Sequence, residues 1–164
     1  MLADLPRISA DERGSMENQN SQLMARELSE RIIGIYYEVY NEIGYGFLES
    51  VYGNCMYLAL TEAGLKVQRE IPIPVWFRGK DVGSFKADLI VENCILLELK
   101  AVKSLDRSHE AQILNYLRGT TLEVGLLMNF GAPKPEFRRL AFSNENKKIR
   151  VNPRASAVGG SGIS

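Results

Sequence analysis

The sequence predicts a single α/β domain in which a mixed central sheet is flanked by helices. Two segments with helical periodicity come first, and three alternating segments rich in Ile, Val and aromatic residues follow them. A third helical segment then leads into the short apolar run 123–130. Because a crossover helix joins parallel strands, we expect the strand over 123–130 to lie parallel to an earlier one. At 164 residues, the chain is long enough for one domain with a real core.

The ends of the chain differ from its middle in composition. Residues 1–22 are polar and show no periodicity, so we expect a disordered leader there. Residues 151–164 are rich in Gly and Ser, which predicts a flexible tail. We therefore place the folded domain at residues 23–150.

Two helices should open the domain. Apolar and aromatic residues recur at helical spacing over residues 28–43, and Gly44 ends this first helix. A second helix follows the glycine turn and is closed by Gly64. Glu49 falls in its first turn, where the helix dipole favours an acid by about 0.3–1 kcal/mol. This is a sufficient structural reason for Glu49, and the residue pattern alone leaves a functional role open.

A three-stranded meander should follow. In the first strand, residues 66–77, Pro72 and Pro74 place their missing N–H groups on one edge, which predicts an edge strand. A turn at 78–81 leads to a return strand over 82–91, which carries Asp88. A tight turn at residues 92–93 then leads to the third strand, 94–102. The meander brings Asp88 near the third strand if both share a face.

The third strand carries two opposite charges on one face. Its even-numbered residues include Glu98 and Lys100, while its odd-numbered residues are apolar. Charged side chains are rarely buried unless they are paired or bound to something. An ordinary ion pair at a strand end and a functional site both account for this placement.

A helix should begin after Lys103, with Ser104 or Asp106 as its N-cap, and end at Gly119. Its polar stripe contains His109, Gln112 and Tyr116. A neighbouring stripe should pack on the sheet and consists of Ala111, Leu114 and Leu117. Residues 137–142 read as a last edge strand.

Composition narrows the function classes. The chain is 45% hydrophobic and 24% charged, as expected for a soluble globular protein, and it shows no transmembrane span or signal peptide. Two isolated cysteines without a CxxC pattern favour a reducing, cytoplasmic location and argue against a zinc site. The net charge is zero, although residues 1–62 hold 4 Lys/Arg against 10 Asp/Glu. The basic balance of the remainder favours nucleic acid only weakly.

Three acids and one lysine suggest a common chemistry. Asp88 and Glu98 on adjacent strands, with Glu49 at a helix start, could supply the oxygen ligands that Mg²⁺ prefers. Lys100 lies on the same side as Glu98 and could orient a water or offset phosphate charge. Such a site suits hydrolysis of a phosphodiester bond.

The order of these residues is similar to that of a known group of enzymes. Asp88 followed by Glu98-Leu99-Lys100 resembles the PD-(D/E)xK nuclease superfamily, although Lys86-Ala87 stands where the name has a proline. Gly46-Phe47-Leu48-Glu49-Ser50-Val51-Tyr52 resembles the motif of the GxxExxY family, which is assigned to that superfamily. The resemblance covers residues 28–142. It implies a restriction-endonuclease-like core with the element order αβββαβ.

The resemblance also implies roles for single residues. Glu49, Asp88 and Glu98 correspond to the metal-binding acids, and Lys100 to the catalytic lysine. Gln112 and Tyr116 resemble a QxxxY helix motif that flanks the active site and contacts nucleic acid or orients the lysine. His109 becomes an accessory candidate on the same stripe.

Two classes of function follow. The first is a nuclease dependent on Mg²⁺ or Mn²⁺ that hydrolyses DNA, which the resemblance favours over RNA. The alternative is a catalytically silent module that binds nucleic acid or protein, which the zero net charge favours. We expect no membrane partner, and the resemblance leaves a homodimer open.

Overall fold

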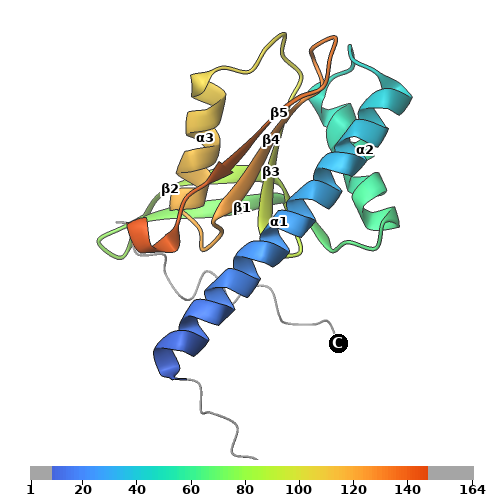
Figure 1. The fold of residues 1–164 in the computed structure, drawn as a ribbon. Helices are drawn as coiled ribbons and strands as arrows, with labels where there is room; N and C mark the ends of the chain where they lie inside the picture. Colours follow the sequence, from blue (N-terminus) through green and yellow to red (C-terminus); the bar gives the residue numbers. More distant parts are fainter. Residues whose placement is uncertain (1–8, 148–164) are drawn as a thin grey trace, which may run out of the picture.

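The computed structural model describes residues 9–147. Two helices, α1 (Ala10–Ile43) and α2 (Glu49–Glu62), precede the strands β1 (Val67–Phe77), β2 (Lys80–Val91) and β3 (Ile95–Lys100). Helix α3 (Arg107–Arg118) then leads to β4 (Val124–Asn129), β5 (Glu136–Ala141) and the short 3₁₀ helix η1 (Asn144–Asn146). Figure 1 shows these elements along the chain. The predicted tail, 151–164, lies outside the described residues.

The five strands form one mixed sheet in the order β1-β2-β3-β4-β5. Strands β3 and β4 are parallel, and each of the other neighbouring pairs is antiparallel. The predicted crossover through α3 and the predicted edge positions of β1 and β5 are therefore confirmed. This is the predicted α/β class, with helices flanking a mixed sheet of restriction-endonuclease-like form.

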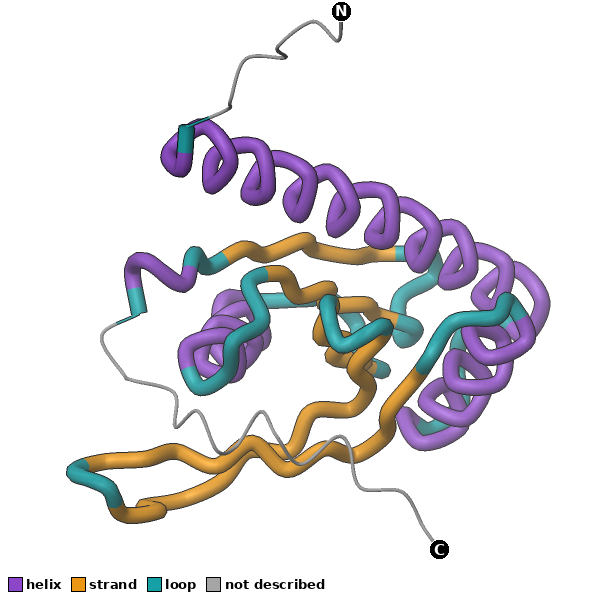
Figure 2. Tube along the Cα trace, turned by 90° about the horizontal axis from the view of Figure 1, so that it is seen from below, coloured by secondary structure: helices purple, strands orange, loops and turns teal. Residues whose placement is uncertain are grey.

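The helices cover opposite faces of the sheet. Helices α1 and α2 pack on one face and share a large apolar core with the odd-numbered residues of β3. Helix α3 packs on the other face, in a smaller core that includes Leu96 and Leu127. Figure 2 shows the sheet curling around α3, with the outer part of the β1–β2 hairpin on one side and β5 on the other.

The predicted disordered leader is wrong for residues 10–22, which form the start of α1. Ser9 caps this helix, because its hydroxyl accepts from the backbone N–H of Glu12 and the Glu12 carboxylate accepts from Ser9 N–H. This capping box needs no packing partner, so apolar periodicity does not reveal it. Residues 1–8 lie outside the described residues.

The packing face of α3 also differs from the prediction. Its buried residues are Ile113, Tyr116 and Leu117, whereas Ala111 is exposed. The predicted cap at Asp106 and end at Gly119 are both observed. The helix is turned so that Tyr116, expected on a solvated stripe, lies 5% exposed against the sheet.

Among residues 9–147, no helix combines the length and apolar character that a membrane span requires.

Candidate active site

The polar centre of the molecule lies where β3 ends, on the face covered by α3. The alternation predicted for β3 is observed: Leu97 and Leu99 join the α1/α2 core, while Leu96 joins the α3 core. Glu98 and Lys100 therefore point to the α3 side. Their side chains are only 4% and 13% exposed, so neither is an ordinary surface charge.

The two carboxylate oxygens of Glu98 differ in their hydrogen bonding. Its Oε1 accepts from Lys100 Nζ at 3.1 Å and from Gln112 Nε2 at 2.9 Å. Its Oε2 is buried and has no hydrogen-bond partner among the described residues. A buried carboxylate oxygen without a partner is costly and calls for an unseen ligand or proton.

Asp88 supplies a second acid from the neighbouring strand. The pairing of Leu89 with Leu97 places it beside Glu98, and its Oδ2 accepts from the backbone N–H of Leu99 at 2.8 Å. Burial raises the pKa of Asp88, against the opposing effects of the Leu99 hydrogen bond and of Lys100. Burial, followed by the Asp88 charge, raises the pKa of Glu98 to about 7. The two acids thus share one weakly solvated site with an excess of negative charge.

Lys100 is held in its charged form. Burial by itself lowers the pKa of this ammonium, but attraction from Glu98, and then from Glu49 and Asp88, outweighs burial and raises it. A lysine that stays protonated cannot act as a base near neutral pH. It can offset negative charge on a bound phosphate.

Gln112 and Tyr116 complete the α3 side of the site. Gln112 Nε2 donates both to Glu98 and to the Tyr116 hydroxyl, the latter at 2.7 Å. Burial raises the pKa of Tyr116, so its phenol stays neutral. Gln112 therefore fixes the orientation of the Glu98 carboxylate, and Tyr116 holds Gln112 in place.

Glu49 lies near the site without joining it. Its charge is close enough to raise the pKa values of Glu98 and Lys100, yet its side chain is exposed at the start of α2. Within residues 9–147, no three acidic, histidine or cysteine side chains are grouped so that they could hold a metal ion. The metal-binding set Glu49, Asp88 and Glu98 therefore stays a prediction from the sequence and the resemblance.

Two further residues of the predicted motifs have clear structural roles. Tyr52 is fully buried, and its hydroxyl bonds to Gly44 O and Phe47 N, which fixes the loop that leads to Glu49. His109 Nδ1 accepts from the backbone N–H of Asp106 at 3.1 Å as part of the N-cap of α3. Its ring nitrogen is therefore used in capping the helix.

A buried amide that sequence reasoning missed supports the end of β3. Asn129 lies opposite Lys100 in the parallel pair. Its Oδ1 accepts from Val102 N and Gly131 N, each at 3.0 Å, and its Nδ2 donates to Val102 O at 2.8 Å and to Glu136 Oε2 at 3.3 Å. These bonds fix the chain immediately after Lys100. The available signal was a polar residue ending the buried run GLLMN.

Gly131 belongs to the same arrangement. A Cβ atom at this position would lie 2.3 Å from Val102 N and 2.4 Å from Ala101 C, both backbone atoms. Only glycine lets the chain after β4 approach the chain after β3 so closely.

The family model of the PD-(D/E)XK nuclease superfamily matches residues 26–140. The chain belongs to the PD-(D/E)XK nuclease superfamily. Searches of curated proteins and of solved structures each found no significant match. The match runs from within α1 to within β5, and so contains every residue of the site described above.

Members of this superfamily generally use divalent metal ions, and two observations show that the site fits one. Glu98 Oε2 is buried without a partner in the described part of the chain, and the adjacent Asp88 and Glu98 carboxyls both have raised pKa values. A divalent cation would give Glu98 Oε2 a partner, and its positive charge would lower the pKa values of both carboxyls. The donors are carboxylate oxygens, the ligands that Mg²⁺ and Mn²⁺ prefer.

Proposed function

We propose that the protein is a nuclease of the GxxExxY family that hydrolyses phosphodiester bonds in DNA and depends on Mg²⁺ or Mn²⁺. The observation that carries this proposal is the buried Oε2 of Glu98, which has no partner within residues 9–147 and is flanked by Asp88 and by the charged Lys100. The superfamily supports nuclease chemistry in general. The motif from Gly46 to Tyr52 supports the finer assignment.

In this proposal Asp88 and Glu98 hold the metal ion. When bound, the ion lowers the pKa of a water molecule and stabilises negative charge on the phosphate. Lys100 offsets further charge on the phosphate, since its ammonium stays protonated in the site.

The remaining residues act through orientation and charge. Gln112 would hold the Glu98 carboxylate in its orientation, because its Nε2 donates to Oε1 and leaves Oε2 without a partner among residues 9–147. Glu49 has no salt bridge among residues 9–147 and would add negative charge at the edge of the site.

A cleavage assay with metal tests this function. Wild-type protein is incubated with single-stranded DNA, double-stranded DNA and RNA, with and without millimolar Mg²⁺ or Mn²⁺. We expect metal-dependent cleavage, with DNA favoured, and a loss of about 10²–10³-fold in Lys100→Ala, as for the removal of one charge-stabilising group. Lys103→Ala is the matched control, because Lys103 is exposed in the loop that follows β3. Equal cleavage by the two variants contradicts the assignment of Lys100.

A silent binding module is the second candidate, and the lack of a three-acid group among residues 9–147 favours it. In that case no substrate is cleaved with either metal. Binding of nucleic acid or protein then survives Lys100→Ala with little change. The two functions are therefore separated by the same variant.

The cytoplasmic location and the homodimer remain predictions from the sequence. Fractionation of cells and sedimentation of the purified protein, with and without DNA, test them.

A further inference from the structure

The β1–β2 hairpin extends well beyond the sheet. Strand β2 pairs with β3 only over Leu89–Val91, whereas its pairing with β1 continues outward to Lys80. Residues 71–77 and 80–87 thus form a two-stranded ribbon that projects from the body, as Figure 2 shows. An isolated two-stranded ribbon is at best marginally stable in water, so its persistence needs packing or a partner.

Among residues 9–147, the inner part of the ribbon packs against the α3 core. Ile73 is 3% exposed, and Ile71 and Phe85 pack against the α3 core. At the ribbon tip, residues 76–82, Phe77 and Val82 are 58% and 59% exposed. The described residues bury neither side chain, and apolar groups gathered at an exposed projection suit a binding surface.

The tip carries positive charge beside the exposed Phe77 ring. Arg78 and Lys80 are exposed and form no salt bridge among residues 9–147, in contrast to Lys86, whose Nζ lies 2.9 Å from Glu70 Oε1. The Arg78 guanidinium lies 5.0 Å from the centre of the Phe77 ring. Asp81 is the one acid of the tip, and its Oδ1 accepts from Gly83 N–H to close the turn.

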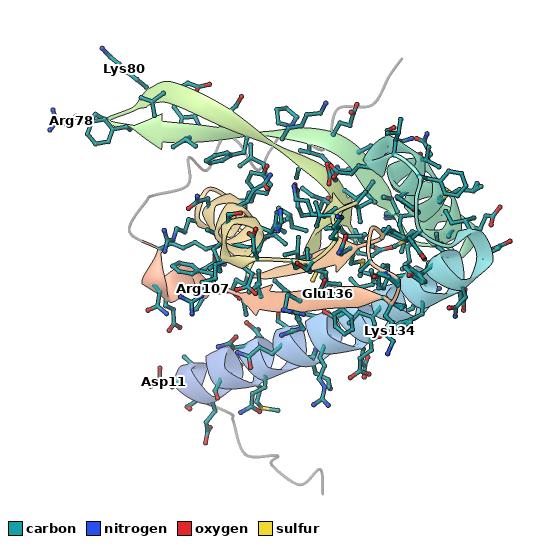
Figure 3. The ribbon with its side chains drawn as sticks, turned by 90° about the horizontal axis from the view of Figure 1, so that it is seen from above. Asp11, Arg78, Lys80, Arg107, Lys134 and Glu136 are labelled. Carbon is teal, nitrogen blue, oxygen red and sulfur yellow. The ribbon has the colours of Figure 1, made fainter. Side chains whose placement is uncertain are left out.

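Positive side chains beside an exposed aromatic ring are suited to binding nucleic acid. Lys and Arg neutralise phosphates, and aromatic rings stack on bases. A two-stranded ribbon also fits the major groove of a duplex. Figure 3 shows Arg78 and Lys80 at the end of the projection, away from Lys134 on the opposite side of the molecule.

The ribbon is continuous with the candidate active site. Asp88 lies on β2 itself, and the Phe85 ring packs 5.1 Å from the ring of Tyr116. From Asp88 to Lys80 the strand advances about 26 Å at roughly 3.3 Å per residue. That length corresponds to roughly eight base pairs of DNA at about 3.4 Å each.

We propose that the ribbon tip is a nucleic-acid-binding arm that holds the substrate up to about eight base pairs from the cleaved bond. The substrate class rests on the proposed nuclease function, while binding by the tip does not require cleavage. Arg78 and Lys80 contact phosphates, and Phe77 stacks on a base or sugar.

Binding without metal tests the arm separately from catalysis. Fluorescence anisotropy in EDTA follows labelled duplex and single-stranded DNA of about 30 nucleotides, well beyond the reach of the ribbon. We expect Arg78→Ala/Lys80→Ala to weaken binding roughly tenfold and to lower the slope of log affinity against log salt by about 1 to 2. Phe77→Ala should weaken binding about fivefold with the slope unchanged.

The matched control is Arg13→Ala/Lys134→Ala, which removes the same charge from exposed positions outside the ribbon. Melting curves confirm that each variant is folded. We expect the control to bind like wild type.

The outcomes separate this proposal from the nuclease function. Tip-dependent binding without cleavage in Mg²⁺ or Mn²⁺ supports the arm and overturns the nuclease. Equal binding by the tip variant and the control overturns the arm, whether or not the protein cleaves DNA. Failure of wild-type protein to bind either form of DNA also overturns the arm.

Discussion

The two faces of β3 carry alternate residues of one short strand and serve opposite purposes. On the α1/α2 side, Leu97 and Leu99 are buried among apolar and aromatic groups. On the α3 side, Glu98 and Lys100 are nearly as buried, but in a polar site where one Glu98 oxygen has no partner among the residues that the structure describes. Burial on the first face stabilises the fold. Burial of Glu98 on the second face opposes folding and prepares the site to bind a cation.

The largest effect should come from the apolar face. Leu97→Ala removes a fully buried side chain from the main core, and we expect a loss of about 2–5 kcal/mol in the free energy of unfolding by urea. Val82→Ala, at an exposed tip position, should change it by less than about 0.5 kcal/mol. A loss below about 1 kcal/mol for Leu97→Ala would show that this face is not the main source of stability.

The next largest effect should come from Asn129, a buried polar side chain whose hydrogen bonds are all made. Asn129→Ala leaves Val102 and Gly131 backbone groups without partners, so we expect a loss of about 3 kcal/mol. Asn115→Ala on the exposed surface of α3 is the control. The same urea titration measures both, and stability equal to the control would contradict the role given to Asn129.

The buried Glu98 carboxylate should lower the stability of the fold, and the size of this effect should depend on pH. Its pKa is about 7 in the folded protein against 4.5 when unfolded, so between these values the folded protein binds more protons. Stability of the metal-free protein should therefore fall as pH rises from about 4.5 to 7, by roughly 2 kcal/mol.

Glu98→Gln should remove most of this fall and be at least as stable as wild type at pH 7. Urea titrations in EDTA at several pH values measure the free energy of unfolding of both proteins. A wild-type stability that rises over this range would show that the pKa of Glu98 is not raised in the folded protein.

The smallest effect should come from Tyr116→Phe. The hydroxyl accepts one hydrogen bond from Gln112, so its loss should change stability by less than about 1.5 kcal/mol. Cleavage should fall severalfold, because Gln112 then holds Glu98 less firmly. Tyr37→Phe, on an exposed ring of α1, is the control, and identical cleavage by the two variants would remove Tyr116 from the site.

Much of the fold could be predicted because its signals are local. Alternation in β3 predicted the faces of Glu98 and Lys100, the prolines of β1 predicted an edge strand, and the crossover through α3 predicted a parallel strand. Gln112 was assigned to the site from its spacing and from the resemblance, and its bond to Glu98 agrees with that position. The metal ligands and catalytic roles remain predictions.

What was missed depends on contacts between distant segments. Asn129 is important because β4 brings it beside Val102, and no local pattern states that pairing. Tyr116 is buried because residues of β1, β2, β3 and β4 pack with it in the α3 core. The place of Glu49 depends on the loop that Tyr52 fixes through its bonds to Gly44 and Phe47. The start of α1 was the exception, since the Ser9–Glu12 capping box is visible in the sequence.

The central claim is that Asp88 and Glu98 together hold a divalent cation, and thermal melting with added metal tests it most directly. Saturating Mg²⁺ or Mn²⁺ at about ten times Kd should raise the melting temperature of wild-type protein by about 3–5 °C. Asp88→Asn and Glu98→Gln should lose this rise, while Glu38→Gln on the exposed side of α1 should keep it. No rise in wild-type protein, or an equal rise in all four proteins, would contradict the claim.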